Sequence, residues 1–115
     1  MSEPARTAEI RFRIRLDEDH LPIGIEWSAT DAPEGARETK SVLLSVWNAE
    51  EQKAMCIDLW TRSMLVEEMK LFVFQTFRTL ADTLERATSE REMAQEVRRL
   101  ADRFAGKVGI EPPPE

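Results

Sequence analysis

The sequence has few of the residues that build common chemical sites. It holds one cysteine and one histidine among 115 residues, so no intramolecular disulfide can form and the spacing of a zinc site is absent. It also has no glycine-rich loop of the kind that binds phosphate groups. We therefore expect no catalytic residue, no metal site and no bound cofactor.

Long apolar runs and an excess of positive charge are also missing. No apolar stretch approaches the ~20 residues that a membrane span needs, and residues 1–6 lack the apolar run of a secretory signal. The net charge is −6, whereas nucleic acids and anionic membranes select basic surfaces. We expect a cytoplasmic protein that binds no nucleic acid and does not insert into a membrane. Its acidity suits solubility or a basic partner.

What the sequence does contain is a change of hydrophobic period at about Thr61. Before this residue apolar and polar side chains alternate, and after it apolar side chains recur every three to four positions. A chain of this length has the size of one domain. The predicted domain covers residues 9–110, between a flexible N-terminus at 1–8 and a flexible proline-rich tail at 111–115.

Alternation predicts strands over residues 10–16, 23–27, 40–47 and 53–60. The last two read as a hairpin with a four-residue loop, Asn48 to Glu51, in which Trp47 lies opposite Gln52. This pairing predicts an apolar core face made of Val42, Leu44, Val46, Met55, Ile57 and Leu59. The opposite face carries Leu43, Ser45, Trp47, Ala54, Cys56, Asp58 and Trp60. Because a solvated sheet face rarely holds so many large apolar groups, we expect this second face to be an interface.

Two helices are predicted after Thr61. The first begins at Ser63 as N-cap, the second begins with a capping box of Ser89 and Glu92, and Gly106 ends it. The first helix has two apolar stripes, a broad one and a narrow one that holds Leu71, Phe74 and Ala81, so we expect it to be covered on two sides. We predict the sheet on one side and the second helix or another subunit on the other.

These elements predict an α+β fold, with a four-stranded antiparallel sheet followed by two α-helices packed on one face. The element order is similar to that of the export chaperone SecB, which is an analogy at the level of fold.

Four features have a chemical and a structural interpretation. The acidic cluster beside His20 is more typical of a solvated turn than of a cation site. The Cys56 thiol is expected to be partly buried and unreactive, because its neighbours in sequence are apolar. Asp58 is expected to pair with an arginine or serine, and the row Arg11, Arg13 and Arg15 is expected to be solvated or paired with Glu26.

Several segments in order resemble the GldC family of gliding-motility proteins: IEWSATD at 25–31, LSVW at 44–47, IDLWT at 57–61, VEEMK at 66–70 and ADTLERAT at 81–88. Together they lie within residues 9–110. The resemblance implies a small cytoplasmic accessory protein of gliding bacteria, associated with surface motility and protein secretion. It brings no assigned enzymatic activity and no catalytic residue.

We therefore expect a non-enzymatic interaction protein, chaperone-like or an assembly factor, that contacts a protein partner or forms a homo-oligomer. The residues expected at this interface are Leu43, Trp47, Cys56, Trp60, Leu71 and Phe74. The alternative is a small ligand-binding domain or enzyme that uses the outer sheet face, with Asp58 and Cys56 or the arginine row. This alternative requires a concave pocket with convergent polar groups.

Overall fold

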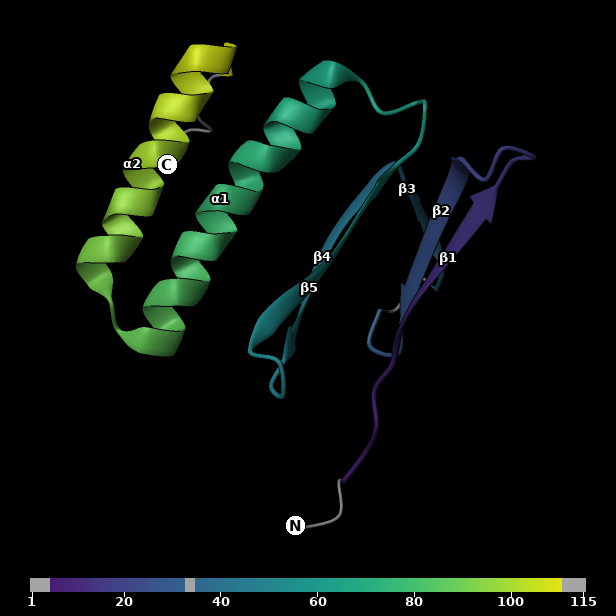
Figure 1. Ribbon diagram of the computed structural model, residues 1–115, viewed down its shortest axis with the longest axis horizontal. Helices are drawn as coiled ribbons and strands as arrows, with labels where there is room; N and C mark the ends of the chain where they lie inside the picture. Colours follow the sequence, from purple (N-terminus) through teal and green to yellow (C-terminus); the bar gives the residue numbers. More distant parts are fainter. Residues whose placement is uncertain (1–4, 33–34, 111–115) are drawn as a thin grey trace. The chain divides into compact units, whose positions relative to one another are not determined.

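The computed structural model describes residues 5–32 and 35–110, so the predicted tail at 111–115 and part of the predicted N-terminal segment lie outside the described residues. Five strands precede two helices, which confirms the α+β class (Figure 1). The elements are β1 Ile10–Leu16, β2 Pro22–Ala29, β3 Arg37–Thr39, β4 Ser41–Asn48, β5 Lys53–Trp60, α1 Val66–Thr88 and α2 Arg91–Val108. The chain divides into two compact units, residues 1–64 with the strands and residues 65–115 with the helices.

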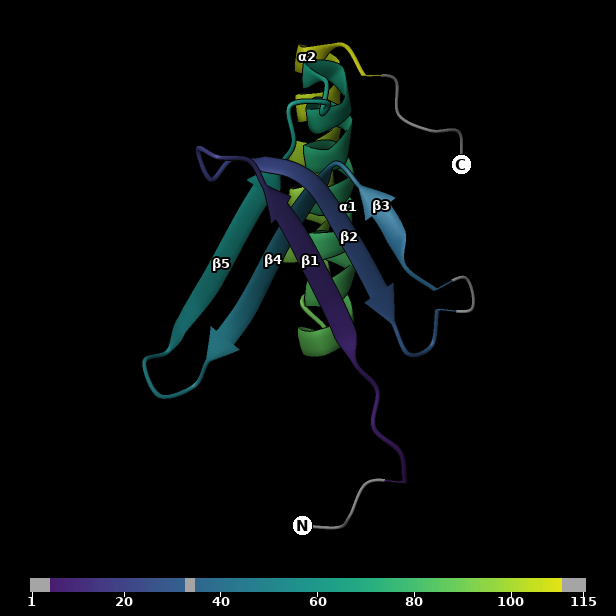
Figure 2. The same cartoon turned by 90° about the vertical axis from the view of Figure 1, so that its right-hand side faces the viewer.

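The strands form two small antiparallel sheets, so the prediction of one four-stranded sheet is wrong. One sheet has the order β1-β2-β3, and the other consists of β4 and β5 (Figure 2). At Lys40 the chain stops pairing with β2 and begins pairing with β5. Thr39 still pairs with Ile25 of β2, whereas the Lys40 carbonyl accepts a hydrogen bond of 2.9 Å from the Thr61 amide at the end of β5. A single residue thus separates the two sheets.

Strand β3 is the element that the sequence did not predict. Its three residues, Arg37-Glu38-Thr39, include no apolar side chain, so alternation cannot reveal it. It forms because it pairs with the middle of β2, where Glu38 lies opposite Glu26 and Arg37 opposite Trp27.

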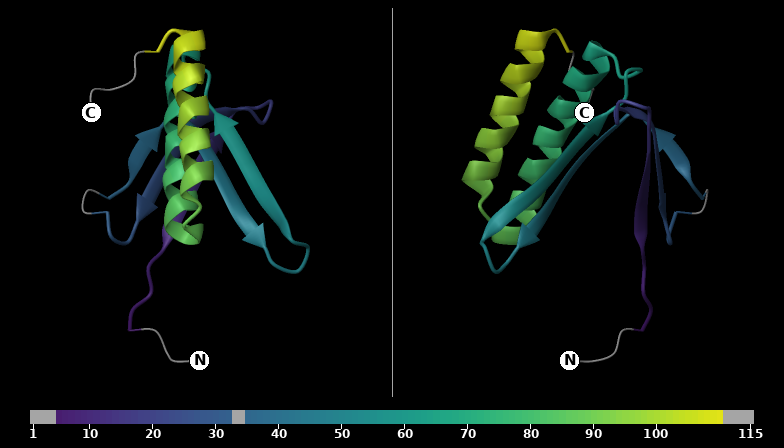
Figure 3. Two further views of the ribbon diagram at one scale, coloured as in Figure 1. Left: turned by 90° about the vertical axis from the view of Figure 1, so that its left-hand side faces the viewer. Right: turned by 45° about the vertical axis from the view of Figure 1, so that its right-hand side comes forward.

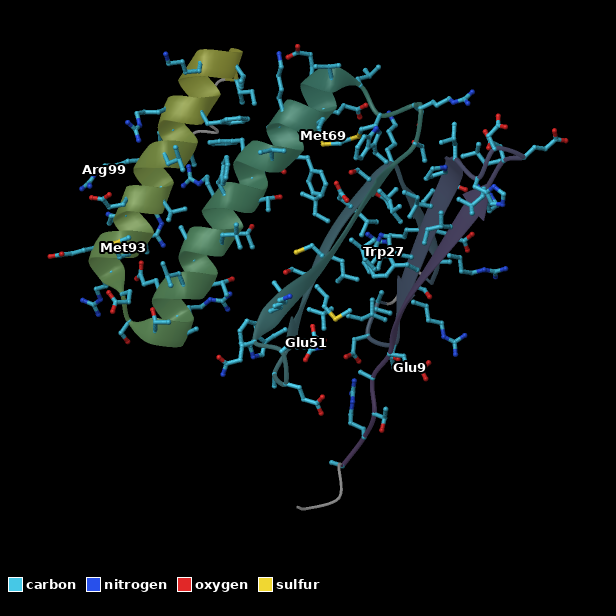
Figure 4. The ribbon with its side chains drawn as sticks, in the orientation of Figure 1. Glu9, Trp27, Glu51, Met69, Met93 and Arg99 are labelled. Atoms are coloured by element: carbon cyan, nitrogen blue, oxygen red, sulfur yellow. The ribbon has the colours of Figure 1, made fainter. Side chains whose placement is uncertain are left out.

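The three-stranded sheet has one apolar and one charged face. Ile14 lies opposite Ile25 and Phe12 opposite Trp27, so these side chains share a face. Ile25 is fully buried, and Trp27 lies between this sheet and the β4–β5 hairpin (Figure 4). The apolar face of the sheet therefore supplies the interior of the first unit.

The β4–β5 hairpin has a register two residues away from the predicted one. Trp47 lies opposite Ala54 and not Gln52, and the loop runs from Ala49 to Gln52. The Asn48 side chain fixes this loop, because its Oδ1 accepts hydrogen bonds from the amides of Glu50 and Glu51 at 3.0 and 3.1 Å. A shift of two residues preserves which side chains share a face, so the two predicted faces are confirmed.

The face predicted as core, here called the aliphatic face (Val42, Leu44, Val46, Met55, Ile57 and Leu59), is buried only in part. Val42, Leu44 and Leu59 are half-buried, but Val46, Met55 and Ile57 are more than half exposed. The buried residues are instead those beside Lys40 at the start of the hairpin, namely Ser41 and Thr61. The prediction of a uniform core is therefore wrong for the loop half of the hairpin.

The second unit is an antiparallel pair of helices (Figure 3). Phe74 and Ala81 of α1 are fully buried, as are three alanines of α2, Ala94, Ala101 and Ala105. The small side chains of α2 allow the two helix axes to approach closely. Phe77 and Phe104 add an edge-to-face contact with ring centroids 5.5 Å apart. Within the narrow stripe of α1, Phe74 is thus covered by the second helix.

The helix ends differ from the predicted ones by a few residues. Leu65, not Ser63, precedes α1, and its amide donates to the Glu68 carboxylate at 2.9 Å. Ser89 has a left-handed backbone, with φ of 62°, and ends α1 instead of beginning α2. Gly109, with φ of 80°, ends α2 instead of Gly106, because glycine adopts this conformation without steric cost.

Candidate functional site

The predicted interface face is present on the β4–β5 hairpin, and we call it the tryptophan face (Leu43, Ser45, Trp47, Ala54, Cys56, Asp58 and Trp60). Cross-strand pairing places Leu43 opposite Asp58, Ser45 opposite Cys56 and Trp47 opposite Ala54. Its large apolar side chains are exposed by 43% at Leu43, 65% at Trp47 and 53% at Trp60. The face therefore presents two tryptophans and one leucine on a single strand pair.

The Cys56 thiol is exposed rather than partly buried, so that prediction is wrong. Its neighbours on the face are small: Ser45 lies across the strand pair and Ala54 two residues before it. The Ser45 hydroxyl and the Cys56 sulfur are 3.4 Å apart, within hydrogen-bond distance. No described residue supplies a histidine beside this thiol, since the single histidine is His20 in the β1–β2 turn.

The two predicted interface residues on α1 have different environments. Leu71 is 41% exposed. Phe74 is fully buried in a cluster with Ala101 and Ala105, so its assignment to an interface is wrong. A helical wheel groups both residues in one stripe, but it cannot tell which turn of α1 meets α2.

The arginine row lies on the charged face of the three-stranded sheet, as predicted. Arg15 makes two ion pairs, at 3.5 Å to Glu26 and 3.0 Å to Glu38, and Arg11 pairs with Glu9 at 3.1 Å. The expected partner of the row, Glu26, is thus confirmed, and β3 supplies a second carboxylate. Because these pairs neutralise two of the three arginines, the row resembles a solvated charged face more than an anion site.

The acidic cluster beside His20 forms the β1–β2 turn. Asp17 Oδ1 accepts hydrogen bonds from the amides of Asp19 and Leu21 at 2.8 and 3.0 Å. His20 itself has a left-handed backbone, with φ of 63°. Since Asp17 closes the turn on its own backbone, the interpretation as a turn is supported. No cluster of histidine, cysteine and carboxylate side chains suited to a metal ion occurs within residues 5–32 and 35–110.

One pocket of about 280 Å³ adjoins the tryptophan face. It is lined by Leu21, Pro22, Asp58, Leu59, Trp60 and Arg62. Arg62 also makes an ion pair of 3.6 Å with Asp17 of the β1–β2 turn. Of these residues, the sequence indicated Asp58 and Trp60 but not Arg62, Leu21 or Pro22. No sequence signal links these residues, because the pocket forms only where the turn approaches the end of β5.

The helical unit has one set of strong polar contacts. Arg98 of α2 donates hydrogen bonds of 2.8 Å to both Asp82 and Glu85 of α1. The hydrogen bond from Arg98 lowers the pKa of the Asp82 carboxyl below its ordinary value. Arg99 points away from α1 (Figure 4), and the exposed face of α2 is charged. These contacts stabilise the packing of α1 against α2 and include no chemically reactive side chain.

Comparison with known proteins gives one family. Residues 22–110 match the family described as gliding motility-associated protein GldC-like. No curated protein and no solved structure gives a significant match to this chain. Neither helix of the described chain has the length and apolar character that crossing a bilayer requires.

Proposed function

Since this chain belongs to the GldC-like family, we propose that it is a non-enzymatic cytoplasmic accessory protein of the gliding-motility and secretion apparatus that acts by binding another protein. The family supports the association with gliding motility. The observation that carries the mode of action is the exposure of Leu43, Trp47 and Trp60 on one face. Exposed tryptophans, here at the two ends of one face, are typical anchors of protein interfaces, where a few aromatic side chains provide most of the binding energy.

The face also suggests what kind of partner it binds. Asp58 lies opposite Leu43 within the apolar set, and the whole chain has a net charge of −6. A partner segment with apolar side chains and a basic residue near Asp58 would complement both features. Such segments are exposed in proteins that await assembly or export, so we propose a chaperone-like or assembly role.

A second candidate is a small ligand-binding domain or enzyme, and the pocket beside Trp60 is the observation that favours it. Asp58 and Arg62 offer one carboxylate and one guanidinium at an otherwise apolar pocket. This pair could bind a small zwitterion. We rank this candidate second because the two tryptophans and Leu43 extend over more of the hairpin than the pocket does.

Complementation in the chain's own host would separate the two candidates. The gene is deleted and then restored as Trp47→Ser, which lies outside the pocket, as Asp58→Asn/Cys56→Ala, or as the control Leu80→Ser, an exposed position on α1. Colony spreading and the amount of secreted surface protein are measured. We expect the tryptophan variant to fail and the other two to work. Loss of function only in the Asp58→Asn/Cys56→Ala variant would favour the pocket, and thermal unfolding of each purified variant checks that it folds.

A further inference from the structure

Strand β4 has a free edge that lacks the usual protection against strand pairing. Its eight residues, SVLLSVWN, include no charged residue, proline or glycine. Soluble proteins normally block an exposed edge with charges, proline, bulges or very short strands, because the unpaired backbone groups recruit other strands. An edge of this length without any of these devices is typical of a strand that is paired in the functional state.

The other strand edges of the described chain are protected. Strand β1 carries three arginines and an irregular register between Arg15 and Leu16. Strand β3 has only three residues, two of them charged, and β5 contains Lys53 and Asp58. Because the other edge strands of the same chain are charged or short, the lack of such protection is a particular feature of β4.

One hydrogen bond shows which backbone groups of β4 point toward β5 and which point to the free edge. The Thr61 amide donates to the Lys40 carbonyl, and antiparallel ladders alternate between bonded and non-bonded pairs. The backbone groups of Val42, Leu44 and Val46 therefore point toward β5, and those of Leu43, Ser45 and Trp47 point to the free edge. The Ser41 carbonyl agrees with this alternation, since it accepts a hydrogen bond of 3.2 Å from the Thr39 hydroxyl outside the β4–β5 ladder.

We propose that β4 pairs antiparallel with β4 of a second copy of this chain around a two-fold axis at Ser45, which joins two hairpins into a four-stranded sheet. In this register Ser45 lies opposite itself and Leu43 lies opposite Trp47 of the other copy. All three residues with outward backbone groups are used, so the pairing makes about six hydrogen bonds. On the aliphatic face, the same register sets Leu44 opposite Val46 of the other copy.

A second copy suits this edge better than a different partner for two reasons. The strand is self-complementary, because each exposed Trp47 meets a Leu43, and aromatic–aliphatic pairs of this kind stabilise sheets. The strand also has no charge that would select an oppositely charged segment. The neighbouring register, centred on Leu44, sets Trp47 opposite Ser41, whose carbonyl already accepts the Thr39 hydroxyl.

Pairing also removes a weakness of the hairpin itself. A two-stranded ribbon is marginally stable in water, whereas four strands give a sheet with a continuous apolar face. In the loop half of the aliphatic face, the exposed Val46 would gain Leu44 of the second copy as a neighbour. The inference does not depend on the proposed function, because it uses the strand edge, and most of the tryptophan face stays available to a partner.

The test uses the proposed position of Ser45 opposite Ser45 of the second copy. The full chain is prepared as wild type, as Ser45→Lys and as Ser45→Asp, and its dimer dissociation is measured by analytical ultracentrifugation across the micromolar range. We expect a wild-type dimer, a dissociation constant raised about tenfold or more in each variant by like charges placed opposite each other, and restored association when the two variants are mixed. A monomeric wild type, or a mixture that does not associate, would overturn the proposal.

Ala54→Lys is the matched control, because Ala54 is exposed on the same face but lies on β5. We expect it to leave the dimer intact. Equal weakening by Ala54→Lys would show that the copies meet through the whole face, against the edge pairing. Trp60→Ser is likewise expected to keep the dimer, so failure of the partner proposal and failure of this one are distinguishable.

Amide hydrogen exchange of the wild type gives a readout that needs no variant. In the dimer, the amides of Leu43, Ser45 and Trp47 should be protected together with those of Leu44 and Val46. In a monomer the protection should alternate along β4, with the outward amides exchanging fast. Fast exchange at all three outward positions in a concentrated sample would contradict the pairing even if a Ser45 variant failed to fold.

Discussion

Arg98 of α2 and Asp82 of α1 form a hydrogen-bonded ion pair of 2.8 Å that joins the two helices. Both side chains keep access to solvent at this contact. Because Arg98 also bonds Glu85 at 2.8 Å, one guanidinium holds two carboxylates one helical turn apart. The ion pair therefore stabilises the packing of the two helices, and it makes their stability depend on pH.

We predict that replacing Asp82→Asn lowers the melting temperature of the helices at neutral pH but not in acid. The Arg98 hydrogen bond lowers the pKa of the Asp82 carboxyl below its ordinary value of 3.8. A lowered pKa contributes stability that is present above 3.8 and is lost as the pH falls through the folded-state value. Circular dichroism melts of wild type and variant from pH 7 to pH 2 should converge at the acid end. A difference that persists there would contradict the assignment.

We predict a large loss of stability for Phe74→Ala and a small one for Leu71→Ala. Phe74 is fully buried against two alanines of α2, whereas Leu71 is 41% exposed. Removing a buried phenylalanine side chain costs about 3–5 kcal/mol of unfolding free energy, and a partly exposed leucine costs much less. Urea unfolding followed by circular dichroism at 222 nm measures both. Equal losses would mean that Leu71 is covered in solution.

We predict that Gln52→Gly stabilises the β4–β5 hairpin. Gln52 has a left-handed backbone, with φ of 53°, a conformation that costs about 1 kcal/mol for residues with a Cβ atom and little for glycine. The control is Glu51→Gly, because Glu51 is the neighbouring loop residue and does not have a positive φ. It should destabilise the hairpin through the greater entropy of the unfolded chain. Tryptophan fluorescence during urea unfolding reports on both variants.

We predict that Asn48→Ala weakens the same hairpin by about 1 kcal/mol. The Asn48 side chain accepts hydrogen bonds from the loop amides of Glu50 and Glu51. Asn48→Asp is the matched control, since a carboxylate accepts the same two hydrogen bonds. If Asn48→Ala and Asn48→Asp had the same free energy of unfolding, the loop would be held by backbone pairing alone.

The sequence predicted the parts of the fold that depend on local periodicity. Alternation along β4 and β5 assigned each side chain to the correct face, because the assignment depends on parity and survives an error of two residues in register. It could not predict β3, since Arg37-Glu38-Thr39 has no apolar member. It also missed the change of partner at Lys40, which depends on a hydrogen bond to Thr61, 21 residues away in the sequence.

The candidate site was predicted in part for the same reason. Leu43, Trp47 and Trp60 share an exposed face, as alternation on a strand indicates. Phe74 was misassigned because a wheel shows a stripe but not where along the helix a neighbour packs. The pocket residues Leu21 and Arg62 were missed because only the fold brings the β1–β2 turn to the end of β5.

The change of sheet at Lys40 has a consequence for how the chain folds. On either side of it, strands pair with their neighbours in sequence, β1 with β2 and β4 with β5, and α1 pairs with α2. Each hairpin closes a short loop, which carries a small entropic cost and forms within about 10 microseconds. The backbone should therefore reach its native pairs early, and a later phase that depends on protein concentration would report the meeting of two chains.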